Sequence, residues 1–162
     1  MDHMAIPPAM IGDVYLNLRT YPIRVGNVVE NGVEMGNSGD FYSDGEELTW
    51  EEVAQRAGMP PDEAAKLVER ERTTVTKRIR RVFSFSHIGL QDAVRVNGAN
   101  KLIVNFIQYV NWADRGLKGG PEALEKLSNE SREFIEKVER SAGVPVVLIG
   151  TGEKHDEVIA LE

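Results

Sequence analysis

One apolar run constrains the fold of this chain more than any other feature. It reads L-I-V-N-F-I at Leu102–Ile107 and is preceded by Gly98. A run with so little polar alternation suits a central strand of a sheet that is covered on both faces. A second run of this kind, V-P-V-V-L-I, follows at Val144–Ile149. The sequence therefore predicts an α/β sheet built around these two strands.

Helices are expected between and before the strands. The segment Asp13–Thr20 alternates apolar and polar residues and predicts a half-buried strand. Thr49 and Glu52 form a capping-box pattern at the start of a helix, and Ser86 is a suitable N-cap for another. Helices are predicted over residues 49–58, 60–70, 86–98, 122–127 and 131–142. The expected fold class is α/β, as part of a mixed, mostly parallel sheet flanked by helices.

Two segments are expected to lack regular structure. Residues 1–12 contain Pro7-Pro8 and no periodic pattern, which is typical of a connection. Residues 28–48 are rich in Gly, Asn, Ser and Asp, so they predict a long flexible loop. Loops of that length inside compact domains tend to be functional or mobile.

The densest chemical feature is the stretch R-T-T-V-T-K-R-I-R-R-V-F-S-F at 72–85. It holds five cations among hydroxyls: Arg72, Lys77, Arg78, Arg80 and Arg81. Guanidinium groups bind carboxylate and phosphate oxygens through paired N–H donors, and threonine hydroxyls can serve the same anion. The stretch therefore favours an anion-binding loop. The alternative is a basic strand whose charges simply lie in water.

Two turns and one helix end could add to such a site. The turn R-V-G-N at 24–27 places a guanidinium near Gly26, where the backbone can adopt a positive φ. The turn G-T-G at 150–152 follows the expected strand at 144–149, at the edge where open α/β sheets bind ligands. The helix that starts at Ser86 would direct its amino end toward the cations. Either turn alone could also be an ordinary one.

The composition narrows the ligand to a small anion. The 162 residues carry a formal net charge of −7, which argues against a nucleic-acid partner because phosphate neutralisation needs a basic surface. There is no cysteine, and His3, His87 and His155 lie far apart, so no metal site is expected. No apolar run approaches the roughly 20 residues of a membrane span, so no membrane partner is expected and cytoplasm is the expected location.

The order of these motifs resembles the carboxyl-terminal third of adenylosuccinate synthetases. The matching pieces are R-V-G at 24–26, T-V-T-K-R-I-R-R at 74–81, A-V-R-V-N at 93–97, I-E at 135–136, G-V-P at 143–145 and G-T-G at 150–152. The resemblance spans nearly the whole chain. It implies that residues 1–162 form the carboxyl-terminal portion of such a domain, with a sheet that is incomplete relative to the full family fold.

The family joins aspartate to the 6-position of IMP, with GTP and Mg²⁺. The resemblance therefore implies a purine-nucleotide ligase in which residues 72–85 are the substrate loop. It assigns aspartate contacts to Thr74, Val75, Thr76, Lys77, Arg78, Ile79 and Arg80. It assigns the IMP-type nucleotide to Val25 and Arg78, and the triphosphate to Arg80, Asn105, Gly150, Thr151 and Gly152. No catalytic residue and no metal ligand of the family falls on this chain.

One departure from the family concerns the nucleotides. Members carry a Lys-Leu-Asp stretch after the arginine loop, whose Asp reads guanine, whereas this chain has V-N-F-I-Q at 104–108. This change, with T-Y-P-I-R-V-G-N at 20–27, resembles a branch in phages and some prokaryotes. Members of that branch can use dGMP in place of IMP and ATP in place of GTP, in the 2-aminoadenine pathway. IMP is the first expectation, and a dGMP-specific synthetase is the alternative.

A second departure is the lack of a G-D-E-G-K-G phosphate loop, with its catalytic Asp, and of the family's acid His. The resemblance thus implies a fragment or one half of a split enzyme, which alone would not catalyse. It would work with an amino-terminal portion, which would hold most of the Mg²⁺ contacts, and as a homodimer when complete. The alternative from another class is a stand-alone nucleotide- or anion-binding module.

Overall fold

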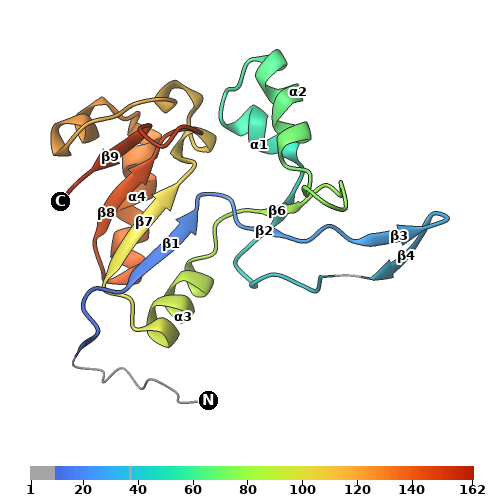
Figure 1. The fold of residues 1–162 in the computed structure, drawn as a ribbon, viewed down its shortest axis with the longest axis horizontal. Coiled ribbons are helices and arrows are strands. Elements are labelled where there is room, and N and C mark those ends of the chain that lie inside the picture. The colour runs from blue at the N-terminus through green and yellow to red at the C-terminus, as the bar shows by residue number, and fades with distance from the viewer. Residues whose placement is uncertain (1–9, 37) are drawn as a thin grey trace.

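A four-stranded sheet forms the centre of the computed structural model, which describes residues 10–36 and 38–162 (Figure 1). Three strands run parallel in the order β1 (Tyr15–Arg19), β7 (Lys101–Asn105) and β8 (Val146–Gly150). β9 (Val158–Ala160) pairs antiparallel with β8 at the edge. The expected mixed, mostly parallel sheet is therefore confirmed, although the sequence analysis did not foresee β9.

Helices cover one face of this sheet. α3 (His87–Asn97) and α4 (Asn129–Ala142) contact each other, and Figure 1 shows α4 behind the strands. Leu102 and Val104 of β7 are buried in the core on this side, together with α4. This core consists of Leu90, Leu102, Val104, Ile107, Ala123, Leu127, Ile135, Val138, Val146, Ile149 and Ile159.

The opposite face of the sheet is only half-buried. Ile103 of β7 pairs with Leu148 of β8, and neither residue belongs to a buried cluster. Tyr15 of β1 is 51% exposed on the same face. The expectation that the run at 102–107 is covered on both faces is therefore wrong for this chain, because both crossover helices pack on one side.

A smaller unit packs beside the carboxyl ends of the parallel strands. Its antiparallel sheet has the order β2 (Ile23–Arg24), β6 (Arg81–Phe83) and β5 (Glu47–Leu48). Two helices, α1 (Trp50–Arg56) and α2 (Pro61–Arg70), contact each other over a second core. That core consists of Leu48, Trp50, Val53, Ala54, Leu67, Val82 and Tyr109.

The predicted helix caps are confirmed. Thr49 and Glu52 form both hydrogen bonds of a capping box at the start of α1. Ser86 caps α3, and Gly98 ends it in the left-handed conformation with φ +61°. The segment predicted as a helix at 122–127 is instead the 3₁₀ helix η4 (Pro121–Lys126). β7 stops before residue 107 because Phe106 has φ 65°, and the 3₁₀ helices η2 (Ile107–Tyr109) and η3 (Trp112–Asp114) follow.

The region predicted as a long loop at 28–48 contains regular structure. β3 (Val28–Glu30) and β4 (Val33–Gly36) form a hairpin that extends away from the rest of the molecule in Figure 1. Asn31 and Gly32 make its turn with φ of 52° and 79°, which is the usual chemistry of an Asn-Gly hairpin. The loop prediction is therefore wrong over 28–36 and at 47–48, where β5 lies. Its residue 37, and the predicted connection over 1–9, lie outside the described residues.

Within the described part of the chain, every helix is too short or too polar to cross a membrane.

Candidate functional site

The tip of the predicted substrate loop is closed by its own hydrogen bonds. After α2, the backbone forms an antiparallel bridge between Arg72 and Ile79. The hydroxyl of Thr73 accepts a hydrogen bond from the backbone N–H of Arg78 at 3.0 Å and lies 2.6 Å from the hydroxyl of Thr76. Lys77 adopts a φ of 54° to complete the turn. Residues 73–78 therefore form a preorganised tip rather than a strand.

Two of the five cations in this stretch serve the fold. Arg81 binds both carboxylate oxygens of Glu47, at 2.7 and 2.6 Å, and also donates to the hydroxyl of Ser38. Arg72 donates to Glu69 at 3.2 Å and to the backbone carbonyl of Lys77. The interpretation of all five cations as one anion-binding cluster is therefore wrong, because acidic residues from neighbouring elements neutralise these two.

Lys77 and Arg78 differ from Arg72 and Arg81. Among the described residues, the side chains of Lys77 and Arg78 have no hydrogen-bond or ion-pair partner. Arg80 is intermediate, because it donates to the carbonyl of Arg72 at 3.1 Å and lies 3.5 Å from a carboxylate oxygen of Glu71. Val75, which the resemblance also places in the substrate loop, is 89% exposed at the tip. Arg78 therefore presents a guanidinium that can pair with an anion from outside.

The R-V-G-N turn packs directly on this loop. Gly26 is buried, and a Cβ atom built on it would lie 2.1 Å from the carbonyl oxygen of Ile79 and 3.4 Å from Cβ of Arg78. The expectation of a positive φ at Gly26 is wrong; only the close approach of the two backbones requires glycine here. The structure thus brings Val25, 61% exposed, next to Arg78, the two residues assigned to the monophosphate.

A first hollow of about 340 Å³ opens between the turn and the loop. Arg80 and Thr73 line it from the loop, and Val25 lines it from the turn. Its full lining is Ile23, Arg24, Val25, Ser38, Thr73 and Arg80. A hollow with two guanidiniums and two hydroxyls suits a small carboxylate or phosphate ligand.

The residues assigned to the triphosphate form a second group at the ends of β7 and β8. A Cβ atom on Gly150 would lie 2.5 Å from Oδ1 of Asn105, so these two positions are in contact. Thr151 is fully buried, and its hydroxyl lies 2.5 and 3.0 Å from the carbonyl oxygens of Leu117 and Glu157. Gly152 packs against the carboxylate of Glu157, whose pKa is lowered by the backbone N–H of Lys154. The hydroxyl of Thr151 thus stabilises the turn at 150–152 itself.

A second hollow of about 350 Å³ lies between the two groups. Arg80 and Ile23 border this hollow as well as the first one. Its lining is Arg19, Ile23, Arg70, Glu71, Arg80, Phe106, Tyr109 and Glu153. It opens where β1, β7 and β8 end, the edge at which parallel sheets bind ligands. Arg80 therefore stands between the two hollows.

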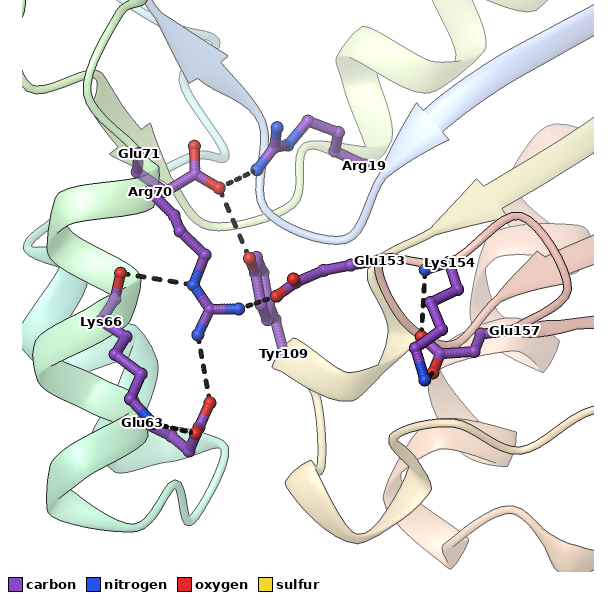
Figure 2. A network of polar contacts seen from close by, with 9 residues as sticks. All are labelled: Arg19, Glu63, Lys66, Arg70, Glu71, Tyr109, Glu153, Lys154 and Glu157. Atoms are coloured by element: carbon purple, nitrogen blue, oxygen red, sulfur yellow. Dashed lines mark hydrogen bonds and ion pairs between the residues drawn. The ribbon is translucent and has the colours of Figure 1, made fainter.

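The sequence analysis missed the polar network in the second hollow (Figure 2). Glu71 is 5% exposed and accepts a hydrogen bond from Arg19 at 2.7 Å, while the hydroxyl of Tyr109 lies 3.5 Å from the same oxygen. Burial, and then the charge of Glu71, raise the pKa of Tyr109 to about 12. Arg70 pairs with Glu63 at 3.1 Å and with Glu153. In the sequence, the signal that could have indicated this network was the position of Arg19 at the carboxyl end of an expected strand.

The amino end of α3 does not serve as an anion site. The carboxylate of Asp44 accepts hydrogen bonds from the hydroxyl of Ser86 at 2.5 Å and from the backbone N–H of Ile88 at 3.0 Å. The chain's own anion thus occupies this helix end, so the expectation that α3 adds to a ligand site is wrong.

The described residues include no group of three or more His, Cys, Asp or Glu side chains placed to hold a metal ion.

Comparison with known proteins identifies relatives, although no family model matches the chain. It is 40% identical over 126 residues to the N6-succino-2-amino-2'-deoxyadenylate synthase of Acinetobacter phage SH-Ab 15497, covering 77% of this chain and 28% of the relative. It is 30% identical over 156 residues to the adenylosuccinate synthetase of Pyrococcus sp. (strain ST700), covering 96% of this chain and 38% of that enzyme. The chain thus spans about a third of the length of these relatives.

Solved structures agree with these matches. The succinoaminodeoxyadenylate synthetase of cyanophage S-2L, bound to dGMP and to dATP as an energy donor, superposes with a TM-score of 0.64 at 30% identity. That match covers 94% of this chain and 34% of the phage enzyme. The adenylosuccinate synthetase of Plasmodium falciparum superposes with a TM-score of 0.67 at 14% identity, over 98% of this chain and 42% of that enzyme, which supports the fold. The chain is therefore a homologue of the adenylosuccinate synthetase family and corresponds to the carboxyl-terminal portion of its members.

Proposed function

We propose that this chain supplies the amino-acid and nucleotide contacts of a ligase that joins aspartate to the 6-position of a purine monophosphate. The aspartate and the monophosphate would bind at the first hollow, which Val25 and Arg80 line, with further contacts from Thr74 to Ile79 at the adjacent loop tip. The second hollow would face the nucleoside triphosphate, with Arg80 between the two ligands and Asn105 and Gly150–Gly152 beside it. An amino-terminal portion would supply the acid–base groups and the Mg²⁺ contacts.

The observation that carries this proposal is the unpaired guanidinium of Arg78 beside the R-V-G turn. Arg72 and Arg81 are neutralised within the fold, whereas Arg78 has no partner among the described residues. A dicarboxylate or a phosphate would supply that partner through paired N–H···O contacts. Because the loop tip is already closed by its own hydrogen bonds, this guanidinium can be presented with little loss of loop entropy.

The relatives support a choice between the two candidate monophosphates. The match to the Acinetobacter phage synthase is 40% identical and the match to the archaeal adenylosuccinate synthetase is 30% identical. The cyanophage relative was solved with dGMP and dATP. These observations favour dGMP over IMP, and ATP or dATP over GTP, as the ligands of this chain.

Calorimetric titration of the purified chain tests the proposal. dGMP, IMP, ATP and GTP would be titrated separately, each with and without aspartate. Arg78→Ala should weaken binding of the preferred monophosphate about tenfold or more, the usual effect of losing a hydrogen bond to a charged group. Arg95→Ala is the matched control, because it removes a cation whose side chain is 76% exposed on α3. Equal losses in both variants would contradict the proposal.

A second assay separates a ligase portion from a binding module. The chain would be mixed with a polypeptide carrying the rest of the cyanophage enzyme, and phosphate release from ATP would be measured with dGMP and aspartate. Release that depends on both polypeptides, and that Arg78→Ala abolishes, supports the ligase. Nucleotide binding without phosphate release in any mixture would favour a stand-alone module.

A further inference from the structure

Glu71 lies where three separate parts of the chain meet. It is the C-cap residue of α2 and immediately precedes the substrate loop, and its backbone carbonyl accepts a hydrogen bond from the N–H of Arg80 at 3.1 Å. Its side chain is 6% exposed and points toward Arg19 at the end of β1 and Tyr109 in η2 (Figure 2). A buried carboxylate is stable only when it is paired, and here two guanidiniums pair it.

The two arginines around Glu71 are held to different degrees. Arg19 donates to Oε1 at 2.7 Å, and its guanidinium lies 4.1 Å from the centre of the Phe106 ring. Arg80 lies 3.5 Å from Oε2 and has one hydrogen bond, to the carbonyl of Arg72. In the described residues the remaining N–H groups of Arg80 have no protein acceptor. Arg80 is therefore oriented from one side and open to a ligand on the other.

We propose that Glu71 is a positioning residue that fixes the guanidinium of Arg80 between the two hollows. Arginine side chains are long and lose rotamer freedom when they bind, so a neighbouring carboxylate that restricts one beforehand lowers the cost of binding an anion. Glu71 also ties Arg80 to Arg19 and, through Phe106, to the strand end that carries Asn105. It thereby links the substrate loop to the residues assigned to the triphosphate.

This role differs from simple electrostatics. The negative charge of Glu71 by itself weakens anion binding, because it lies near the guanidinium that would meet the anion. If Glu71 acts by positioning Arg80, its presence should instead strengthen the binding of an anion of defined shape. Two substitutions separate the effects: Glu71→Asp keeps the charge but shortens the side chain by one methylene, and Glu71→Gln keeps the length but removes the charge.

The first experiment measures the side-chain dynamics of Arg80 in the ligand-free chain. In the unmodified protein, the ¹⁵N relaxation and hydrogen exchange of the guanidinium should show that Arg80 is more rigid and exchanges more slowly than Arg78, which has no partner. Both substitutions at Glu71 should bring the mobility of Arg80 closer to that of Arg78, while the amide spectrum of β7 and β8 stays unchanged. Equal mobility of Arg78 and Arg80 in the unmodified chain would overturn the proposal without any variant.

The second experiment measures ligand binding and rests on the proposed function. Glu71→Asp should weaken the binding of ATP about two- to tenfold, the effect of immobilising one flexible side chain. Inorganic phosphate should bind the variant and the unmodified chain equally. ATP binding that Glu71→Asp leaves unchanged would contradict the positioning role. If the unmodified chain does not bind ATP, the triphosphate assignment fails, and the relaxation measurement still decides the role of Glu71.

Discussion

At the scale of single residues, neighbouring arginines in one stretch have different tasks. Arg81 makes two hydrogen bonds to Glu47 and others to the segment at Ser38, and its side chain is 12% exposed. Arg81→Ala should therefore lower the free energy of unfolding by about 1–3 kcal/mol, the range for lost hydrogen bonds to charged groups. Urea unfolding monitored by circular dichroism measures this change.

Arg78→Ala is the control for that prediction. Its side chain has no partner in the described part of the chain, so the free energy of unfolding should change by less than about 0.5 kcal/mol. Equal destabilisation by the two substitutions would mean that the division between structural and ligand-directed arginines is wrong.

The ion pair of Arg81 also predicts a pH dependence. Hydrogen bonds from Arg81 lower the pKa of Glu47 below its ordinary value of 4.5, which outweighs the opposing effect of burial. A group whose pKa is lower in the folded state stabilises the fold above its unfolded pKa, and that contribution is lost as the pH falls through the folded pKa. The difference in unfolding free energy between the unmodified chain and Arg81→Ala should therefore shrink between neutral pH and about pH 3.5. A difference that is constant over this range would exclude Glu47 as the main partner.

At the scale of elements, the loop tip depends on a residue in an unusual backbone conformation. Lys77 has a φ of 54°, a region that costs residues with a Cβ about 1–2 kcal/mol. Lys77→Gly should therefore be about 1 kcal/mol more stable than Lys77→Ala, because both variants lose the charge and only glycine relieves the backbone. Urea unfolding of the two variants gives this difference. A more stable alanine variant would show that the tip does not adopt this turn in solution.

The contact between the R-V-G turn and the substrate loop gives a second prediction at this scale. Gly26→Ala would place a Cβ atom 2.1 Å from the carbonyl oxygen of Ile79, so one of the two backbones must move. We expect a loss of about 1–3 kcal/mol in unfolding free energy. Amide shifts should be confined to residues 24–27 and 72–80. Gly12→Ala is the matched control, since its added atom meets nothing within 4 Å.

The limits of the sequence analysis follow from the range of the interactions. Caps at Thr49, Ser86 and Gly98, and the strand at β8, depend on nearby residues and were predicted correctly. The pairing of Arg81 with Glu47 joins residues far apart in the chain, so no local pattern indicates it. The same is true of Glu71, which looks like one more charge at a helix end. The hairpin turn at Asn31-Gly32 was visible as a local signal and was overlooked.

At the scale of the whole molecule, the two cores meet along the carboxyl edge of the parallel sheet. Arg19 and Arg70 each form an ion pair across this boundary, with Glu71 and Glu153 respectively. The backbone N–H of Trp112 donates to the carbonyl of Ala57 at 2.8 Å across the same boundary. Both hollows lie on or beside this junction, so the site depends on the relative position of the two units.

The half-buried face of the main sheet predicts how the chain behaves in solution. Ile103 and Leu148 form adjacent, half-buried apolar positions on that face, and Tyr15 is exposed beside Lys101 on the same face. Apolar surface that is left uncovered favours association. We expect the chain to bind an apolar dye and to show a mass in light scattering that rises with concentration. Replacing both Ile103 and Leu148 by Thr, a β-branched residue that suits strands, should reduce both signals.

The control for this last prediction is an apolar residue that lies outside the sheet. Val96 on α3 is 75% exposed, so Val96→Thr removes exposed apolar area from a different surface. If the sheet face drives association, Val96→Thr should behave like the unmodified chain, and only the double variant should become a monomer. Addition of the amino-terminal portion should also suppress dye binding if that portion covers the face. A monomeric, dye-silent unmodified chain would show that this face is stable in water, and the sheet would then need no further covering element.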